Sequence, residues 1–158
     1  MKLKTVAIVV GVFVSVLCQP LFADGSADDY RKAAEQGNAE AQFILASCYE
    51  CGNGVAKNSG EAAKWLRRAA DQGFAEAQFG LGVSYEGGNG VAKDFAEAFK
   101  WYRKAAKQGL KEAQLQLGRC YYYGKGVAED KSEAFKWYRK AAEQGDTDAQ
   151  AELKILEK

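Results

Sequence analysis

The sequence predicts an all-α fold, an α-solenoid of helix pairs that repeats every 36 residues. The phrase Ala-x-Gln-Gly-x-x-x-Ala-Gln begins at Ala34, Ala70, Ala106 and Ala142. Three more registers keep the same step: the tryptophans Trp65, Trp101 and Trp137, the tyrosines Tyr49, Tyr85 and Tyr121, and the glycines Gly54, Gly90 and Gly126. A step shared by four kinds of residue indicates tandem repeats.

The first helix of each unit is predicted from an apolar stripe at helical spacing. From Asn38 to Cys51 the stripe is formed by Ala41, Leu45 and Tyr49. Gly52 follows, and glycine favours the left-handed turn that ends helices.

The second helix is predicted to start at Asn58, Asp94 and Asp130 in successive units. A glutamate stands three residues later each time (Glu61, Glu97 and Glu133), the spacing of a reciprocal cap. The broad face expected to be buried carries Ala62, Trp65, Leu66, Ala69 and Ala70. Gly73, Gly109 and Gly145 are expected to end the successive copies.

The predicted organisation is a half unit at 28–37, full units at about 38–73, 74–109 and 110–145, and a terminal half unit at 146–158. We therefore expect eight helices. A pair this small cannot bury its own apolar face, so neighbouring pairs must stack. Small residues recur where close packing would need them, at Ala46, Gly82 and Gly118.

These repeats closely resemble the Sel-one-like repeat family, a relative of the tetratricopeptide repeat. The pattern Ala-Gln-x-x-Leu-Gly-x-x-Tyr-x-x-Gly-x-Gly-Val is found at Ala77–Val91, and Trp101-Tyr102-x-Lys-Ala-Ala-x-Gln-Gly continues it to Gly109. The resemblance covers residues 28 to 158. It implies a right-handed superhelix of antiparallel helix pairs, with the first helices lining a concave face, and an adaptor role in bacterial secretion, cell-envelope assembly or host interaction.

Residues 1–23 have the layout of a secretory signal peptide, with Lys2 and Lys4, an apolar stretch from Val6 to Leu17, and Ala23 before a polar residue. We expect cleavage near Ala23 and export to the periplasm or medium, with a retained N-terminal anchor as the alternative. The apolar stretch is shorter than the roughly 20 residues that span a bilayer, so no membrane insertion is expected after cleavage.

Charge and composition exclude several functions. Without Lys2 and Lys4 the basic residues number 22 − 2 = 20 against 21 acids, so bulk charge indicates no nucleic-acid partner. There are no histidines, which removes the commonest general base and metal ligand. The sequence predicts no catalytic residue, cofactor or metal site.

The expected partner is another protein or a peptide, bound where the repeats differ. One stripe on the first helices changes from unit to unit, and we call it the variable stripe. It comprises Ile44, Ser47, Cys48 and Cys51, then Gly80, Val83, Ser84 and Gly87, then Gln116, Arg119, Cys120 and Tyr123. We expect it to line the concave groove and receive an extended peptide or helix. The alternative is that these positions are unconstrained and face solvent.

A basic row on the second helices is a second candidate: Lys64, Arg67 and Arg68, Lys100, Arg103 and Lys104, and Lys136, Arg139 and Lys140. It could attract anionic envelope components, but cations near helix C-termini also complement the dipole, and Glu40, Glu76 and Glu112 could offset them.

The cysteines leave two interpretations open. Cys48 and Cys120 are expected to lie too far apart to pair, whereas Cys48 and Cys51 could form a local bridge or remain thiols. A redox role is not favoured, because this Cys-x-x-Cys ends a helix and lacks the positive dipole that lowers a thiol pKa.

The rival function is hydrolysis, because cysteine-rich members of the family that this chain resembles have been labelled penicillin-binding or beta-lactamase-like. The mature chain has no Ser-x-x-Lys, Ser-Asp-Asn or Lys-Thr-Gly motif. We also expect that the outer sides of the two terminal half units can stack end to end, which predicts self-association.

Overall fold

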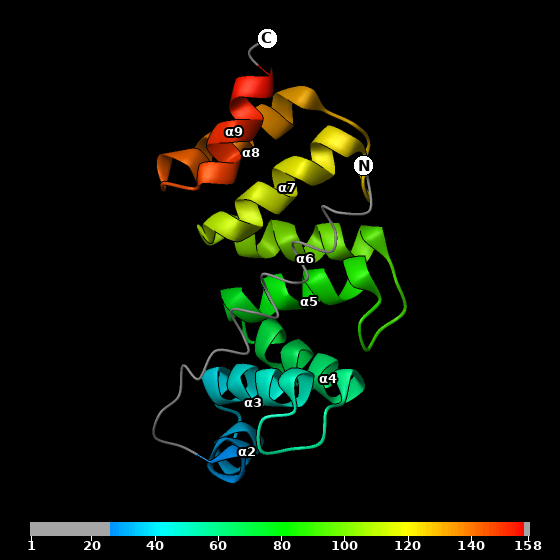
Figure 1. Cartoon of the computed structure of the whole chain (residues 1–158), viewed down its shortest axis with the longest axis vertical. Helices are drawn as coiled ribbons and strands as arrows, with labels where there is room; N and C mark the ends of the chain where they lie inside the picture. The colour runs from blue at the N-terminus through cyan, green and yellow to red at the C-terminus, as the bar shows by residue number, and fades with distance from the viewer. Residues whose placement is uncertain (1–25, 157–158) are drawn as a thin grey trace. The chain divides into compact units, whose positions relative to one another are not determined.

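The computed structural model describes residues 26–156, and within them it contains eight helices and no strand (Figure 1). The helices are α2 (Ala27–Glu35), α3 (Ala39–Cys51), α4 (Ser59–Asp71), α5 (Ala75–Gly87), α6 (Phe95–Lys107), α7 (Lys111–Tyr123), α8 (Lys131–Glu143) and α9 (Thr147–Leu156). The predicted all-α class is confirmed. The predicted signal peptide, residues 1–23, lies outside the described residues.

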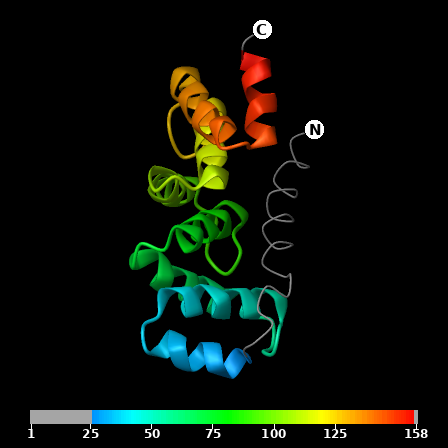
Figure 2. The same cartoon turned by 90° about the vertical axis from the view of Figure 1, so that its left-hand side faces the viewer.

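The chain divides into two compact units, one ending at Lys93 and the other starting at Asp94. In the first, α2 packs on α3, α3 on α4 and α4 on α5; in the second, α6 packs on α7, α7 on α8 and α8 on α9 (Figure 1, Figure 2). Within each unit, each helix therefore contacts the next one along the chain, as expected for a helical repeat protein. None of the helices within residues 26–156 is both long and apolar enough to cross a membrane.

The first helix of each unit starts and stops where the sequence predicts. The Asn38 side chain accepts a hydrogen bond from the backbone N–H of Ala41 at 2.8 Å, which caps α3. Gly52 ends α3 with φ at +77°, and its N–H donates to the Cys48 carbonyl at 2.8 Å. Gly88 and Gly124 end α5 and α7 in the same left-handed conformation.

Only one of the two hydrogen bonds of the predicted reciprocal cap forms at the start of the second helices. The side chains of Asn58, Asp94 and Asp130 accept hydrogen bonds from the backbone N–H groups of Glu61, Glu97 and Glu133. The expected reciprocal bond from these glutamates is wrong. Their carboxylates instead accept from the ammonium groups of Lys64, Lys100 and Lys136, one turn further along. The backbone N–H groups of Asn58 and Asp130 donate instead to the carbonyls of Tyr49 and Tyr121, at 2.8 and 2.9 Å, so they are not available to the glutamates.

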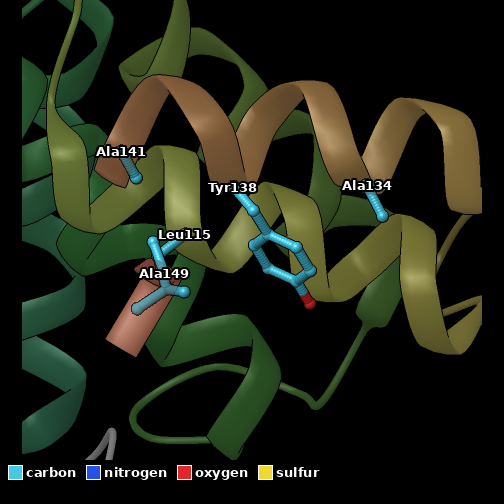
Figure 3. Packing of buried hydrophobic residues seen from close by; sticks show 5 residues of the cluster. All are labelled: Leu115, Ala134, Tyr138, Ala141 and Ala149. Atoms are coloured by element: carbon cyan, nitrogen blue, oxygen red, sulfur yellow. The ribbon is translucent and has the colours of Figure 1, made fainter. Parts of the chain in front are cut away.

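The core of the second unit gathers around Tyr138 of α8, which is fully buried. Figure 3 shows the ring between Ala134 and Ala141 of its own helix, with Leu115 of α7 and Ala149 of α9 on the same side. A Cβ at Gly118 would lie 2.5 Å from Cδ1 of Tyr138. The ring therefore lies against the backbone of α7, which confirms why a small residue is needed there.

Two of the three tryptophans predicted to be buried are only half-buried. Trp101 is 5% exposed, but Trp65 and Trp137 lie at the edge of their packing faces. The buried face of α4 is formed instead by smaller residues such as Ala62 and Leu66.

Candidate functional site

The two glutamines of the repeated phrase form hydrogen bonds that link one helix to another. The second glutamine donates its side-chain N–H to a carbonyl in the last turn of the preceding helix, as Gln42 does to Ala34 at 3.0 Å. Gln78, Gln114 and Gln150 do the same to Ala70, Ala106 and Ala142. Helix C-termini leave such carbonyls without an intrahelical partner. Each of the four accepts one hydrogen bond from the backbone N–H of the following glycine, and the glutamine supplies a second donor.

The first glutamine of the phrase adds a second link. Gln72 donates to the side-chain oxygen of Gln42 at 2.8 Å, and Gln144 donates to that of Gln114 at 2.8 Å. The phrase thus encodes a hydrogen-bond chain that fastens the end of a second helix to its own first helix. Sequence reasoning used the phrase to find the repeat and missed this role, although two polar residues at a fixed spacing were the available signal.

The variable stripe lies deeper in the structure than a solvent-facing stripe would. Seven of its twelve residues are buried: Ile44, Ser47, Gly80, Val83, Ser84, Gln116 and Cys120. Cys48, Cys51 and Arg119 are half-buried, and Gly87 and Tyr123 are exposed. Most of the variable stripe is therefore inaccessible to solvent, and only Gly87 and Tyr123 are exposed.

Several polar groups in the stripe already have partners. The hydroxyls of Ser47 and Ser84 donate to carbonyls of their own helices at 3.1 and 3.0 Å. Arg119 donates from Nε and Nη2 to one carboxylate oxygen of Glu152 in α9, at 3.2 and 3.1 Å, and its side chain is 13% exposed. In the second unit, the stripe thus helps to hold α9 in place.

The stripe reaches solvent most clearly at the C-terminal ends of the first helices. Cys51, Gly87 and Tyr123 occupy the same register, as the last residues of α3, α5 and α7. Tyr123 is 55% exposed, and its ring meets that of Tyr122 edge-on with centroids 4.8 Å apart. The residue at this register changes from cysteine to glycine to tyrosine.

The first members of the basic row pair with acids in their own helix. Lys64, Lys100 and Lys136 bind Glu61, Glu97 and Glu133. Hydrogen bonding to the glutamate raises the pKa of Lys100 and of Lys136. These ion pairs are formed with a carboxylate one turn away on the same helix, and not with Glu40, Glu76 or Glu112 of the following helix.

The other members of the row lie against aromatic rings or further partners. Arg68, Lys104 and Lys140 stand over Trp65, Trp101 and Trp137, at 4.4, 3.7 and 4.4 Å from the ring centroids. Arg67 donates to the Tyr85 hydroxyl, Arg103 stands over Phe99, and Arg139 pairs with Glu143. All nine cations have a local partner, which favours the structural interpretation of the row.

The Cys48 and Cys120 thiols are free, so no bridge joins Cys48 to Cys51. Cys48 is half-buried, and loss of solvent raises the pKa of its thiol. A raised pKa lowers the fraction of reactive thiolate, which agrees with the sequence argument against a redox role. Within residues 26–156, no group of three or more Cys, Asp or Glu residues is placed to hold a metal ion.

A family model for the Sel1 repeat matches residues 30–38, 39–74, 75–110 and 111–146. Comparison with curated proteins finds no match.

Among solved structures, the chain is similar to a Sel1 repeat protein from Oxalobacter formigenes, at 45% identity and a TM-score of 0.75, over 80% of this chain and 96% of that one. It is also similar to c5321, a protective antigen of uropathogenic Escherichia coli strains with an SLR fold, at 44% identity and a TM-score of 0.78 over 80% of this chain. It spans only 27% of the length of c5321. Helicobacter pylori cysteine-rich protein B aligns at 26% identity with a TM-score of 0.63, over 84% of this chain and 98% of that one.

Proposed function

The chain belongs to the Sel1 repeat family, and from that premise we propose that it is an exported adaptor that binds a segment of a partner protein along its first helices. Sel1 repeat proteins are helical scaffolds that generally bind other proteins and are generally not enzymes. The proposal adds three things to this: a location in the periplasm or outside the cell, a binding surface, and the residues that contact the partner.

The observation that carries the proposal is the exposure of Tyr123 at a register where the repeats differ. Most large apolar side chains of the described helices are buried or half-buried, whereas Tyr123 is 55% exposed. Tyrosine suits a binding anchor, because it brings large contact area and a hydroxyl at low cost in side-chain entropy.

The contrast between recurring and varying positions supports the same binding surface. Positions that recur, such as Gln42 and Gln114, are tied into hydrogen bonds of the framework. The partner would be distinguished by positions that vary, and of these the register of Cys51, Gly87 and Tyr123 is nearest to solvent.

The location is proposed from the leader-like residues 1–23, which would direct the chain through the inner membrane. Sequencing the N-terminus of the protein recovered from a periplasmic fraction tests this. An N-terminus near Asp24 is expected, and recovery of the protein only in the cytoplasm would refute it.

The binding surface is tested by affinity capture from an envelope fraction, followed by a binding curve with the partner recovered. Tyr123→Ala should weaken binding at least about tenfold, as the loss of an anchor does. Phe95→Ala is the matched control, since Phe95 is an exposed aromatic on a second helix, 37% exposed. Equal affinities for the two variants and the unaltered protein would exclude this surface.

An activity assay distinguishes the rival hydrolase function from the adaptor function. The adaptor proposal expects no turnover of nitrocefin by the pure protein. Sustained turnover that survives further purification would contradict it.

A further inference from the structure

One buried polar side chain of the variable stripe has no hydrogen-bond partner. Gln116 of α7 is 7% exposed, and no residue that the structure describes forms a hydrogen bond with its carboxamide. Gln114, two residues earlier, instead donates to the Ala106 carbonyl at 3.3 Å and accepts from Gln144 at 2.8 Å. A buried amide without a hydrogen bond is unfavourable, so a bound molecule that brings a donor and an acceptor to Gln116 would be stabilised there.

Gln116 shares one side of α7 with Arg119 and Tyr123. These two residues follow it at i+3 and i+7, which places the three side chains on the same side of the helix. The guanidinium of Arg119 donates to Glu152 of α9 at 3.2 and 3.1 Å. This side of α7 is therefore bordered by α9.

The bordering stripe of α9 consists of Asp148, Glu152 and Ile155, spaced at i, i+4 and i+7. Short loops join α7 and α9 to α8, so both lie antiparallel to α8 and run in the same direction. Tyr123 and Ile155 each lie one turn beyond the ion pair of Arg119 with Glu152, and they are therefore near each other. At 55% and 60%, they are the most exposed large apolar side chains of the described helices.

The other end of this two-helix face is acidic. Glu152 neutralises Arg119, and Asp148 adds a second carboxylate 3.9 Å from Nη2 of Arg119. One cation against two carboxylates leaves one negative charge in excess, and the side chain of Asp148 is 69% exposed. A basic side chain on a partner complements this charge.

We propose that α7 and α9 bind an extended segment of the partner protein in which a basic residue stands about three positions from an apolar one; this rests on the adaptor function proposed above. The carboxamide of Gln116 offers both a donor and an acceptor, which match a main-chain amide of the segment. The apolar side chain contacts Tyr123 and Ile155, and the basic one contacts Asp148. Asp148 and Ile155 are 155 − 148 = 7 residues apart, which is about 10 Å of helix, and an extended chain spans that length in about three residues.

The test is to pan a phage-displayed library of random peptides on the whole purified protein. The enriched peptides should share a lysine or arginine about three positions from a large apolar residue, and the most enriched peptide is synthesised as the probe. Gln116→Leu should weaken its binding about tenfold, whereas stability in urea unfolding should stay equal or rise because an unpaired buried amide is removed. Asp148→Lys should also weaken binding, and more strongly at low salt. Gln150→Leu is the matched control and should leave binding unchanged, since the Gln150 side chain reaches the Ala142 carbonyl of α8 at 3.5 Å.

The inference is overturned if no peptide is enriched, or if the enriched peptides lack the pair of basic and apolar residues. It is also overturned if Gln116→Leu binds the probe as tightly as the unaltered protein, or if it loses stability together with binding. The adaptor function is decided separately by the captured partner. If that partner requires Tyr123 while the peptide results fail, the adaptor function stands and only the chemistry assigned to the segment is wrong.

Discussion

Replacing Gly118 by alanine adds one methyl group where α7 meets α8, and the structure predicts its cost. The new Cβ would lie 2.5 Å from Cδ1 and 2.6 Å from Cε1 of Tyr138, so the ring must move by about 1 Å to regain ordinary contact distances. The ring cannot withdraw freely, because Tyr138 is 0% exposed.

Two effects oppose each other in this substitution. Overpacking a well-filled core by one such group costs about 1–3 kcal/mol, whereas glycine to alanine inside a helix gains about 1 kcal/mol. Because the ring is enclosed, we expect overpacking to outweigh the gain and the free energy of unfolding to fall by up to about 2 kcal/mol.

The first repeat supplies the compensating change. There the same register holds Ala46 with Leu66, and both are buried, at 1% and 5% exposed. In a Tyr138→Leu background, Gly118→Ala should therefore leave stability unchanged or raise it by up to about 1 kcal/mol. Urea unfolding followed by circular dichroism, on all four proteins of the cycle, measures the coupling between the two sites. An identical effect of Gly118→Ala in both backgrounds would refute the packing argument.

Three further substitutions test other parts of the structure. Tyr138→Phe removes a buried hydroxyl that has no hydrogen-bond partner in the structure, so it should leave stability at neutral pH equal or higher by about 1 kcal/mol; a clear loss in urea unfolding would contradict this. Burial also raises the pKa of Tyr138, so above pH 10 the folded protein keeps the phenolic proton while the unfolded chain loses it. The free energy of unfolding should therefore fall by about 1.4 kcal/mol per pH unit in that range. Tyr138→Phe should remove this pH dependence, and identical alkaline unfolding of the two proteins would count against it. Gly126→Ala should destabilise by about 2 kcal/mol or more in thermal unfolding, because φ is +70° and the Cβ would lie on the Phe95 carbonyl; an unchanged melting temperature would show that the loop can move away. Gln42→Leu should lower the free energy of unfolding by about 1 kcal/mol in urea unfolding, because the Ala34 carbonyl then keeps only the N–H of Gly37 as a donor. A neutral result would mean that the backbone donor alone satisfies this carbonyl.

The helices and their limits could be predicted because local sequence encodes them. Asn38 and Gly52 act through hydrogen bonds and backbone angles of their immediate neighbourhood. Because the units repeat every 36 residues, the helix limits predicted in one unit could be compared with those in the others. The eight expected helices are found within residues 26–156.

The candidate surface was less predictable, because exposure depends on which helix packs on which face. The sequence showed that the variable stripe differs between units, but it could not show that Gln116 is buried while Tyr123, two turns later, is exposed. The same holds for Glu61, whose choice between a backbone amide and Lys64 depends on the positions of both groups in space.

The sequence by itself determined the repeat, the helices, their N-cap residues and the family, since periodicity and capping are properties of residues close together in the chain. Only the tertiary structure decided that Gly118 accommodates the Tyr138 ring, that Arg119 is held by Glu152, and that Lys154 faces outward. These depend on contacts between residues 20 or more positions apart and on the faces left uncovered, and no local pattern specifies which side chains will meet there.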